Sequence, residues 1–192
     1  MATVLMHAVV SLDGFIADDD DGVGPLFDWY FNGDRPLDHM GMSLSQASYD
    51  YTRPMWDSIG ATIMGRHLFD LTNGWEAKAP AGEHLVVVSH RPKPAGWHPE
   101  ADVPFFENVP DAVADASRRA GTGVVALCAG DVGGQALAAG LVDEVAMDVV
   151  PVVFGSGKRY FGPVDGQHLL DDPHAVIQGN RVLHLRYRVR KG

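Results

Sequence analysis

The chain has 192 residues, with 15 Lys and Arg against 25 Asp and Glu, which gives a formal net charge of −10. Nucleic acids and anionic membrane surfaces are bound mainly through Lys and Arg, so this balance argues against both as partners. The single cysteine excludes an internal disulfide, and no apolar run reaches the roughly 20 residues of a membrane span. The N-terminus lacks the basic segment of a signal peptide, so we expect a cytoplasmic protein.

The first half of the chain contains three short apolar, β-branched runs that predict strands, at residues 4–10, 61–64 and 85–89. Residues 18–36 are rich in Asp, Gly and Pro and also carry aromatic side chains, and a loop of this length is usually functional or mobile. Residues 43–56 predict a helix that kinks or ends at Pro54, and a brief helix is expected over residues 67–71.

The second half begins with the clearest predicted helix, at residues 108–120. Its apolar residues share one face, and Arg118 and Arg119 lie near its negative end. A strand at 124–128 and a helix at 131–139 follow, with Asp131 expected as the N-cap. A strand is predicted at residues 142–153, broken at Pro151. A closing hairpin is predicted from strands at residues 175–178 and 181–189, joined across Gly179 and Asn180.

This succession of strands and helices predicts an α/β fold with a mostly parallel central sheet and antiparallel strands at its C-terminal edge. No internal repeat or linker is visible, so we expect one domain over residues 1–192.

A glycine-containing segment follows the strand at 124–128 and opens the next helix, where backbone N–H groups can face a phosphate. It holds only Gly130 and Gly133 of a G-x-G-x-x-G fingerprint. A P-loop at residues 155–158 fails because Arg159 replaces the required Ser or Thr. Close packing of helix on sheet is an equally good explanation of Gly133 and its neighbour Gly134.

Polar side chains also follow other predicted strands. Arg66 and Arg91 are candidate phosphate ligands, because ligands bind at the carboxyl ends of parallel strands and Arg binds phosphate bidentately. The alternative for each is a solvated loop cation. Asp13 is a candidate for substrate orientation or proton transfer, and its alternative is a turn-forming Asp-Gly pair. The nine histidines show no zinc-binding spacing, and we expect no metal.

The aromatic residues of the 18–36 segment have two interpretations. Most aromatic side chains belong to a core, but Trp29, Tyr30 and Phe31 lie in a predicted loop and could close over a flat ring. Cys128 lies in an apolar strand and is interpreted as an unreactive core residue.

Several segments together resemble the dihydrofolate-reductase-like superfamily. The closest resemblance is to the C-terminal reductase domain of bifunctional riboflavin-biosynthesis deaminase-reductases. The matching segments are S-L-D-G-F-I-A at residues 11–17, M-G-R at 64–66, L-V-V-V-S at 85–89, G-L-V-D-E at 140–144, P-V-V-F-G-S-G at 151–157 and the strand at 182–187. They occur in order over nearly the whole chain.

The resemblance implies a three-layer α/β/α sandwich that binds NADPH. It places Gly65, Arg66, His67, Ser89, His90 and Arg91 near the adenosine phosphates, with the arginines at the 2′-phosphate. It places Ala129, Gly130, Asp131, Val132 and Gly133 at the pyrophosphate. Ala8, Asp13 and Ile16 would border the nicotinamide and the substrate. The segment at 18–36 would correspond to a mobile active-site loop, and related domains are often homodimers.

Two positions depart from the family pattern. The family usually has Gly-Gly, which spans a cis peptide in dihydrofolate reductases, where this chain has Ala129-Gly130. Dihydrofolate reductases also place a proton-donating acid on the helix after the mobile loop. Asp50 and Asp57 lie in that region, but no motif identifies either of them. The zinc signature of a preceding deaminase domain is absent, so a stand-alone reductase domain is expected.

The leading hypothesis is an NADPH-dependent reductase that transfers a hydride to a small polar heterocycle or to a ribosyl-type carbonyl or imine. Asp13 is the best candidate for substrate orientation or proton delivery. An NADPH-binding module or sensor without turnover is the alternative, motivated by the unidentified proton donor and by Ala129. A third hypothesis is the reductase step of riboflavin synthesis itself, the reduction of 5-amino-6-(5-phosphoribosylamino)uracil.

Overall fold

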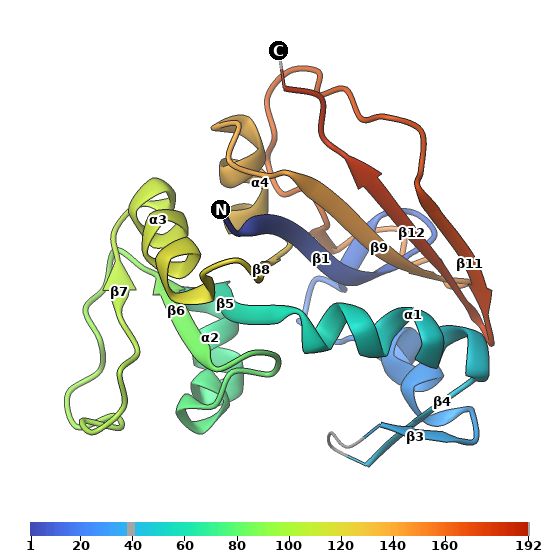
Figure 1. Cartoon of the computed structure of the whole chain (residues 1–192), viewed down its shortest axis with the longest axis horizontal. Coiled ribbons are helices and arrows are strands. Elements are labelled where there is room, and N and C mark those ends of the chain that lie inside the picture. Colours follow the sequence, from blue (N-terminus) through green and yellow to red (C-terminus); the bar gives the residue numbers. More distant parts are fainter. Residues whose placement is uncertain (38–40, 192) are drawn as a thin grey trace.

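A computed structural model describes residues 1–37 and 41–191. Its centre is an eight-stranded sheet in the order β11-β12-β9-β1-β8-β5-β6-β7 (Figure 1). The strands are β1 (Thr3–Ser11), β5 (Ile59–Gly65), β6 (His84–Val88), β7 (Phe105–Phe106), β8 (Val124–Cys128), β9 (Glu144–Val150), β11 (Ala175–Gly179) and β12 (Val182–Arg188). The six strands from β9 to β7 are parallel, and β12 pairs antiparallel with both β9 and β11. The expected mostly parallel sheet with an antiparallel C-terminal hairpin is confirmed.

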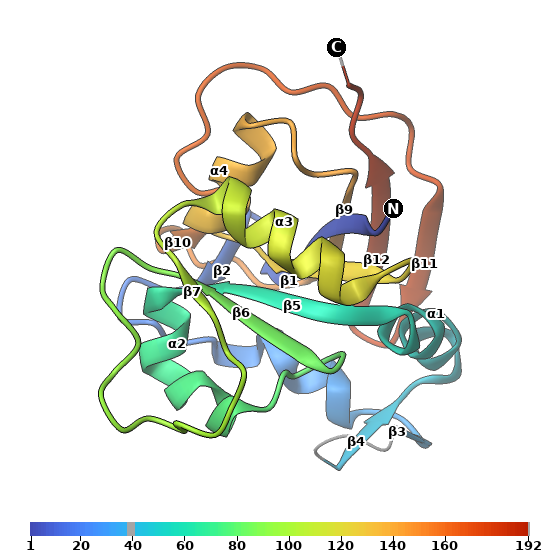
Figure 2. The same ribbon diagram turned by 60° about the vertical axis from the view of Figure 1, so that its left-hand side comes forward.

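Helices cover both faces of this sheet, as Figure 2 shows. One face carries α3 (Val109–Ala120) and α4 (Asp131–Ala138). The other face carries α1 (Gln46–Asp57), α2 (Arg66–Thr72) and the 3₁₀ helix η1 (Gly24–Phe31), and a second 3₁₀ helix, η2 (Asn73–Ala77), follows α2. The result is the expected three-layer α/β/α sandwich. None of the helices in the described residues is long and apolar enough to cross a membrane.

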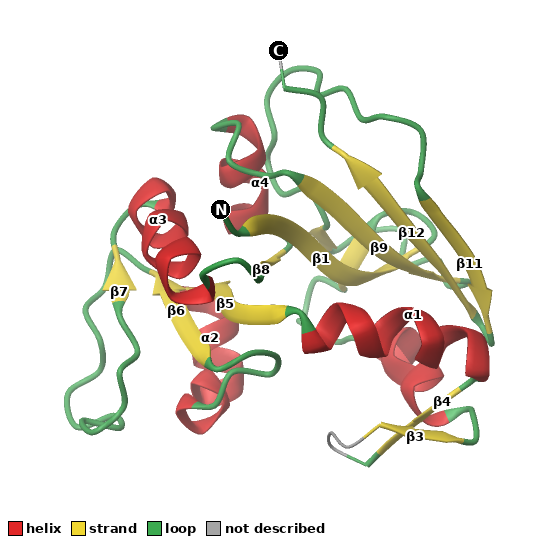
Figure 3. Cartoon of the chain, viewed as in Figure 1, coloured by secondary structure: helices red, strands yellow, loops and turns green. Residues whose placement is uncertain are grey.

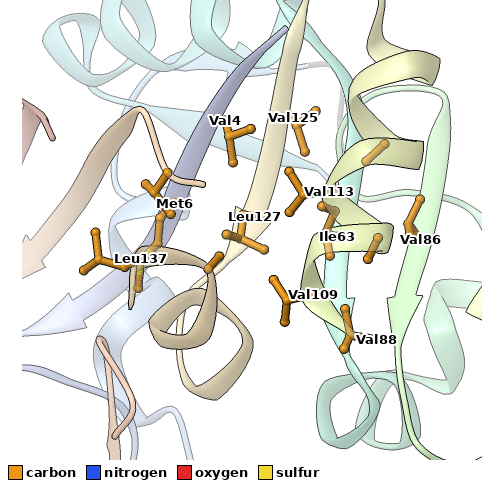
Figure 4. Packing of buried hydrophobic residues seen from close by; sticks show 14 of the residues in the cluster. Val4, Met6, Ile63, Val86, Val88, Val109, Val113, Val125, Leu127 and Leu137 are labelled. Atoms are coloured by element: carbon orange, nitrogen blue, oxygen red, sulfur yellow. The ribbon is translucent and has the colours of Figure 1, made fainter. Parts of the chain in front are cut away.

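The apolar strands are buried on both faces, as expected for parallel strands between helical layers. Along β1, Val4 and Met6 point toward α3 and α4, and Leu5 and Val9 point to the opposite layer. Figure 4 shows how the first face packs, with side chains of the sheet against Val109 and Val113 of α3.

Local signals set the ends of the two best-predicted helices. The Asn108 side chain accepts a hydrogen bond of 2.9 Å from the N–H of Asp111 and caps α3. The Ser45 side chain caps α1. Pro54 lies inside α1, which continues to Asp57, so of the two alternatives for Pro54, a kink or the helix end, the helix end is wrong.

Two short antiparallel pairs lie outside the main sheet. β2 (Phe15–Ala17) pairs with β10 (Lys158–Arg159) (Figure 2), and β3 (Arg35–Leu37) pairs with β4 (Met42–Leu44) (Figure 3). η1 and the first two residues of β3 lie within residues 18–36, the segment that was predicted as a long loop. Leu26, Trp29 and Tyr30 of η1 are buried in the core, so much of this segment is packed structure.

Two further local predictions need correction. The closing hairpin turns at Asn180 and Arg181, because Gly179 pairs with Val182 and Arg181 takes the left-handed conformation with φ of 58°. The strand predicted over 142–153 is shorter, since β9 spans only Glu144–Val150; the predicted break at Pro151, which has no N–H to donate, is confirmed.

Candidate functional site

The carboxyl ends of the parallel strands bring most of the predicted site residues to one edge of the sheet. β1 ends before Asp13, β5 before Arg66, β6 before Ser89 and β8 before Ala129. In open α/β sheets this edge is where ligands bind.

Arg66 and Arg91 follow the neighbouring strands β5 and β6, and both hydrogen-bond to Ser89. Arg66 donates from Nη1 to Ser89 Oγ at 3.5 Å and to the Pro92 carbonyl at 3.1 Å. Ser89 Oγ in turn accepts from the N–H of Arg91 at 2.9 Å. The predicted trio of Arg66, Ser89 and Arg91 is therefore a contiguous cluster.

Asp70 joins the two guanidinium groups of this cluster. Arg66 Nε lies 2.7 Å from one carboxylate oxygen of Asp70, and Arg91 Nη2 lies 2.6 Å from the other. The hydrogen bond from Arg66, followed by that from Arg91, lowers the pKa of Asp70 below its ordinary value. The sequence analysis did not single out Asp70, although its position four residues after Arg66 on a helix is a typical ion-pair spacing.

A cavity of about 440 Å³ adjoins the cluster, between the segment after β6 and the edge strand β7. Its lining residues are Ser89, His90, Arg91, Pro92, Lys93, Val103, Phe105 and Glu107. His90 thus lies beside Arg91, as expected. His67 instead pairs with Asp21 at 2.8 Å, so the structure directs its side chain to the 18–22 turn.

The start of α4 forms the second part of the edge. Gly130 adopts φ of 95°, which favours glycine, and donates its N–H to the Tyr160 carbonyl at 2.7 Å. Gly130 occupies the N-cap position and Asp131 is the first helical residue, so the prediction of Asp131 as N-cap is wrong. A side chain at this conformation would be strained, which explains why the cap residue is a glycine.

The glycines of this helix have two explanations, close packing on the sheet and phosphate binding. A Cβ on Gly134 would lie 2.1 Å from the Phe161 carbonyl oxygen, and one on Gly133 would lie 2.8 Å from Met6 Cε. Close packing therefore requires both glycines. A phosphate-binding role for the N–H groups at the start of the helix is compatible with this packing and stays a prediction.

Contacts connect this helix start to the neighbouring predicted residues. A Cβ at Gly130 would lie 3.4 Å from Ile16 Cδ1, and a Cβ at Gly65 would lie 2.9 Å from Val132 Cγ2. Ala8 and Ile16 pack against the same core cluster as Ala129 and Val132. The residues predicted for the nicotinamide and for the pyrophosphate therefore form one continuous region, which reaches the arginine cluster through Gly65.

Asp13 is held by protein donors. Ser11 Oγ donates to its Oδ1 at 2.6 Å, and the N–H groups of Phe154 and Gly155 donate at 3.2 Å and 2.7 Å. The Ser11 hydrogen bond is the main cause of the lowered pKa of Asp13; desolvation opposes it, and the hydrogen bonds from Gly155 and Phe154 add smaller lowering effects. A carboxylate that stays ionised orients groups well but donates protons poorly, so the geometry favours orientation over proton delivery.

The aromatic residues of η1 do not form a common lid. Trp29 and Tyr30 are 1% and 6% exposed and stack on each other, with ring centroids 4.1 Å apart. Phe31 is 58% exposed. For Trp29 and Tyr30 the core interpretation is correct in this conformation. Burial raises the pKa of Cys128 to about 12, so its thiol is unreactive, as expected.

The predictions missed a polar network on the α1 face of the sheet. His7 Nε2 lies 2.8 Å from Asp148 Oδ2, and His184 Nδ1 lies 2.6 Å from Asp148 Oδ1. His184 Nε2 lies 2.9 Å from Ser48 Oγ. A signal was present in the sequence for two of these residues, because His7 and Asp148 each interrupt an apolar run, at residues 4–10 and 145–150.

The two acids considered as proton donors lie elsewhere. Asp50 accepts a hydrogen bond of 2.7 Å from Gln46, and Asp57 pairs with Arg53 at 2.8 Å, both on the exposed side of α1. Neither carboxylate belongs to the strand-end region.

The sequence profile of the RibD C-terminal domain family matches residues 2–183. No curated protein matches the chain.

Solved structures with the same fold cover essentially the whole chain. A Shewanella sp. PV-4 protein described as a riboflavin biosynthesis protein has a TM-score of 0.71 at 18% identity, with 100% of both chains covered. Enterococcus faecalis dihydrofolate reductase, complexed with NADP(H), has a TM-score of 0.55 at 16% identity, covering 100% of this chain and 97% of that one.

A bifunctional enzyme is also similar. The diaminohydroxyphosphoribosylaminopyrimidine deaminase/5-amino-6-(5-phosphoribosylamino)uracil reductase of Thermotoga maritima has a TM-score of 0.63 at 12% identity. The match covers 98% of this chain but only 57% of that enzyme. At these identities the structures show a shared dihydrofolate-reductase-like fold.

Proposed function

The chain belongs to the family of RibD C-terminal domains, and from this membership we propose that it transfers a hydride from NADPH to a small polar heterocycle or a ribosyl-type intermediate. An oxidoreductase is the activity that family and fold share. The 5-amino-6-(5-phosphoribosylamino)uracil named for the Thermotoga enzyme is the compound we propose to test first.

The observation that carries the choice of cofactor is the cluster of Arg66, Ser89 and Arg91 beside the cavity after β6. NADPH differs from NADH by a 2′-phosphate, and two guanidinium groups with a serine hydroxyl suit a dianionic phosphate. The cluster concentrates positive charge locally in a chain whose formal net charge is −10. The donor set and the adjoining cavity therefore fit an adenosine 2′-phosphate.

The other predicted site residues would contact the rest of the cofactor and the substrate. When bound, NADPH supplies the hydride. The N–H groups at Asp131, Val132 and Gly133 would hold the pyrophosphate at the start of α4, where the helix dipole favours anions. Ala8 and Ile16 would border the nicotinamide. Asp13, ionised and fixed by Ser11, would orient a polar group of the substrate.

The proposed reaction is tested by measuring whether the protein oxidises NADPH in the presence of the compound. Purified protein is mixed with NADPH and 5-amino-6-(5-phosphoribosylamino)uracil, and loss of NADPH absorbance is followed. We expect oxidation of NADPH that depends on both protein and compound. Binding of NADPH without oxidation by this compound or by a metabolite extract would support the sensor hypothesis, and absence of NADPH binding would contradict both.

We also propose a homodimer in the cytoplasm. β11 is an edge strand with Val176 58% exposed, and such edges pair readily with a second chain. Gel filtration with light scattering measures the mass directly, and a monomer would contradict the dimer.

A further inference from the structure

The network of His7, Asp148, His184 and Ser48 reaches the surface at one end. His184 is 0% exposed and Ser48 and Asp148 are each 1% exposed, whereas 19% of the His7 side chain is exposed. Ser48 is thus too deeply buried to act as a nucleophile, despite its Ser-His-Asp arrangement. His7 is the member of this network that a substrate can reach.

The hydrogen bonds leave one nitrogen of His7 available. Asp148 accepts from Nε2, and Nδ1 has no hydrogen-bond partner among the described residues. The backbone carbonyl of His7 accepts from the N–H of Ala129 at 3.3 Å, directly before the turn that opens α4. His7 pairs in register with Cys128, the last residue of β8, so it lies level with the carboxyl end of that strand. Its side chain points to the α1 face of the sheet, opposite to the side chains of Met6 and Ala8.

Asp148 supplies a fixed negative charge behind His7. Burial opposes its ionisation, but the charges and hydrogen bonds of His7 and His184 outweigh burial and lower the pKa of Asp148 to about 2. Other titratable groups near Asp148 are kept neutral, because burial and the Asp148 charge raise the pKa values of Tyr30, Tyr51 and Tyr160. Cys128, opposite His7 on β8, is also neutral, since burial raises its pKa to about 12. Asp148 is thus a buried negative charge 2.8 Å from His7 Nε2.

We propose that His7 is the proton donor of the reductase reaction and that Asp148, held by His184, positions it. This inference rests on the proposed function. When the substrate carbon accepts the hydride, the C=O or C=N electron pair moves onto oxygen or nitrogen, and His7 Nδ1–H donates its proton there. NADPH and the protonated enzyme thereby give NADP⁺, the reduced product and neutral His7, which regains a proton from water.

The first test is His7→Gln, whose amide nitrogen can still donate to Asp148. We expect kcat to fall about 100-fold or more, as is typical when a general acid is removed, while the Kd for NADPH changes less than about twofold. In the wild type kcat should decline as pH rises and the donor loses its proton, and in the variant this decline should disappear. His168→Gln is the matched control and should leave kcat unchanged, because the His168 ring hydrogen-bonds within its own loop, to the Asp165 carbonyl oxygen at 3.3 Å.

The second test does not require turnover. In protein labelled with ¹⁵N at histidine, NMR follows the protonation of His7 Nδ1 as the pH is changed, and the proposal requires this nitrogen to gain and lose a proton. Asp148→Asn should move the transition to lower pH, because it removes a negative charge 2.8 Å from Nε2.

The outcomes separate this inference from the proposed function. Full kcat and an unchanged pH profile in His7→Gln would overturn the proton-donor role while leaving the reductase intact. If the wild type binds NADPH but does not reduce the tested compound, the choice of substrate is wrong. The NMR titration then decides whether His7 can act as the proton donor. An Nδ1 that never changes protonation, or that is insensitive to Asp148→Asn, would overturn the inference for any substrate.

Discussion

Asp70 shares its carboxylate between the two arginines that we assign to the 2′-phosphate. An incoming phosphate must compete with this negative charge for the same donors. Asp70→Asn should therefore raise the affinity for NADPH several-fold and change that for NADH little, as measured by fluorescence titration. Asp172→Asn, at an exposed loop position, is the control. A loss of NADPH affinity would instead mean that Asp70 holds the arginines in their binding conformation.

Asp148 makes stability depend on pH in a defined direction. Its pKa is lowered from 3.8 to about 2, so its ionised form stabilises the fold above about pH 4, and this contribution is lost as pH falls toward 2. The shift corresponds to about 2 kcal/mol. Urea unfolding of the wild type and of Asp148→Asn over this range should show a difference that shrinks as pH falls. A difference that does not change with pH would contradict the assignment.

The polar network also shows what sequence could not predict at single positions. His7 and Asp148 are 141 residues apart, and His184 and Ser48 are 136 apart. Each looked like an isolated polar residue in a strand or helix, and only the order of β1, β9 and β12 in the sheet brings them together. Arg66, Ser89 and Arg91 were predictable because they follow two neighbouring parallel strands, Arg66 after β5 and the other two after β6, at the edge where these strands end.

At the scale of elements, α4 begins where backbone segments approach most closely. Gly134→Ala would place a Cβ 2.1 Å from the Phe161 carbonyl oxygen, a backbone atom that cannot rotate away. The free energy of unfolding should fall by about 1–3 kcal/mol, the usual cost of overpacking. Gln135→Ala, at an exposed position of the same helix, should change it by less than about 0.5 kcal/mol. Equal stability of both variants would refute the packing argument.

The cap of α3 gives an independent test of a helix end. Asn108→Ala removes the acceptor for the Asp111 N–H and should cost about 1 kcal/mol in urea unfolding. Asn108→Asp keeps a capping oxygen and should retain most of the stability. If Asn108→Asp lowers the free energy of unfolding as much as Asn108→Ala does, the hydrogen bond is not what stabilises the helix end.

Elements were predictable where local chemistry decides them. β8 has its predicted bounds, and α3 starts one residue after its predicted first position because Asn108 is its cap. η1 was missed because its burial depends on distant partners, such as the ring of His184, whose centroid lies 5.0 Å from that of Trp29. No local pattern in residues 18–36 carries that information.

At the scale of the whole molecule, the sheet brings basic groups together in a chain whose formal net charge is −10. The parallel strands direct Arg66, Arg91 and the start of α4 to one edge, and these are the groups that we propose to hold the three phosphates of NADPH. His7, the proposed proton donor, is on β1 of the same sheet. Both proposals therefore depend on the same order of strands.

The measurement that tests this account most directly is parallel titration of the wild type and Arg66→Ala with NADPH and NADH. The account predicts that the wild type prefers NADPH, and that Arg66→Ala weakens NADPH binding about tenfold or more while NADH binding changes less than about twofold, because only the 2′-phosphate loses a charged partner. Equal affinity of the wild type for both cofactors, or equal losses in the variant, would contradict it.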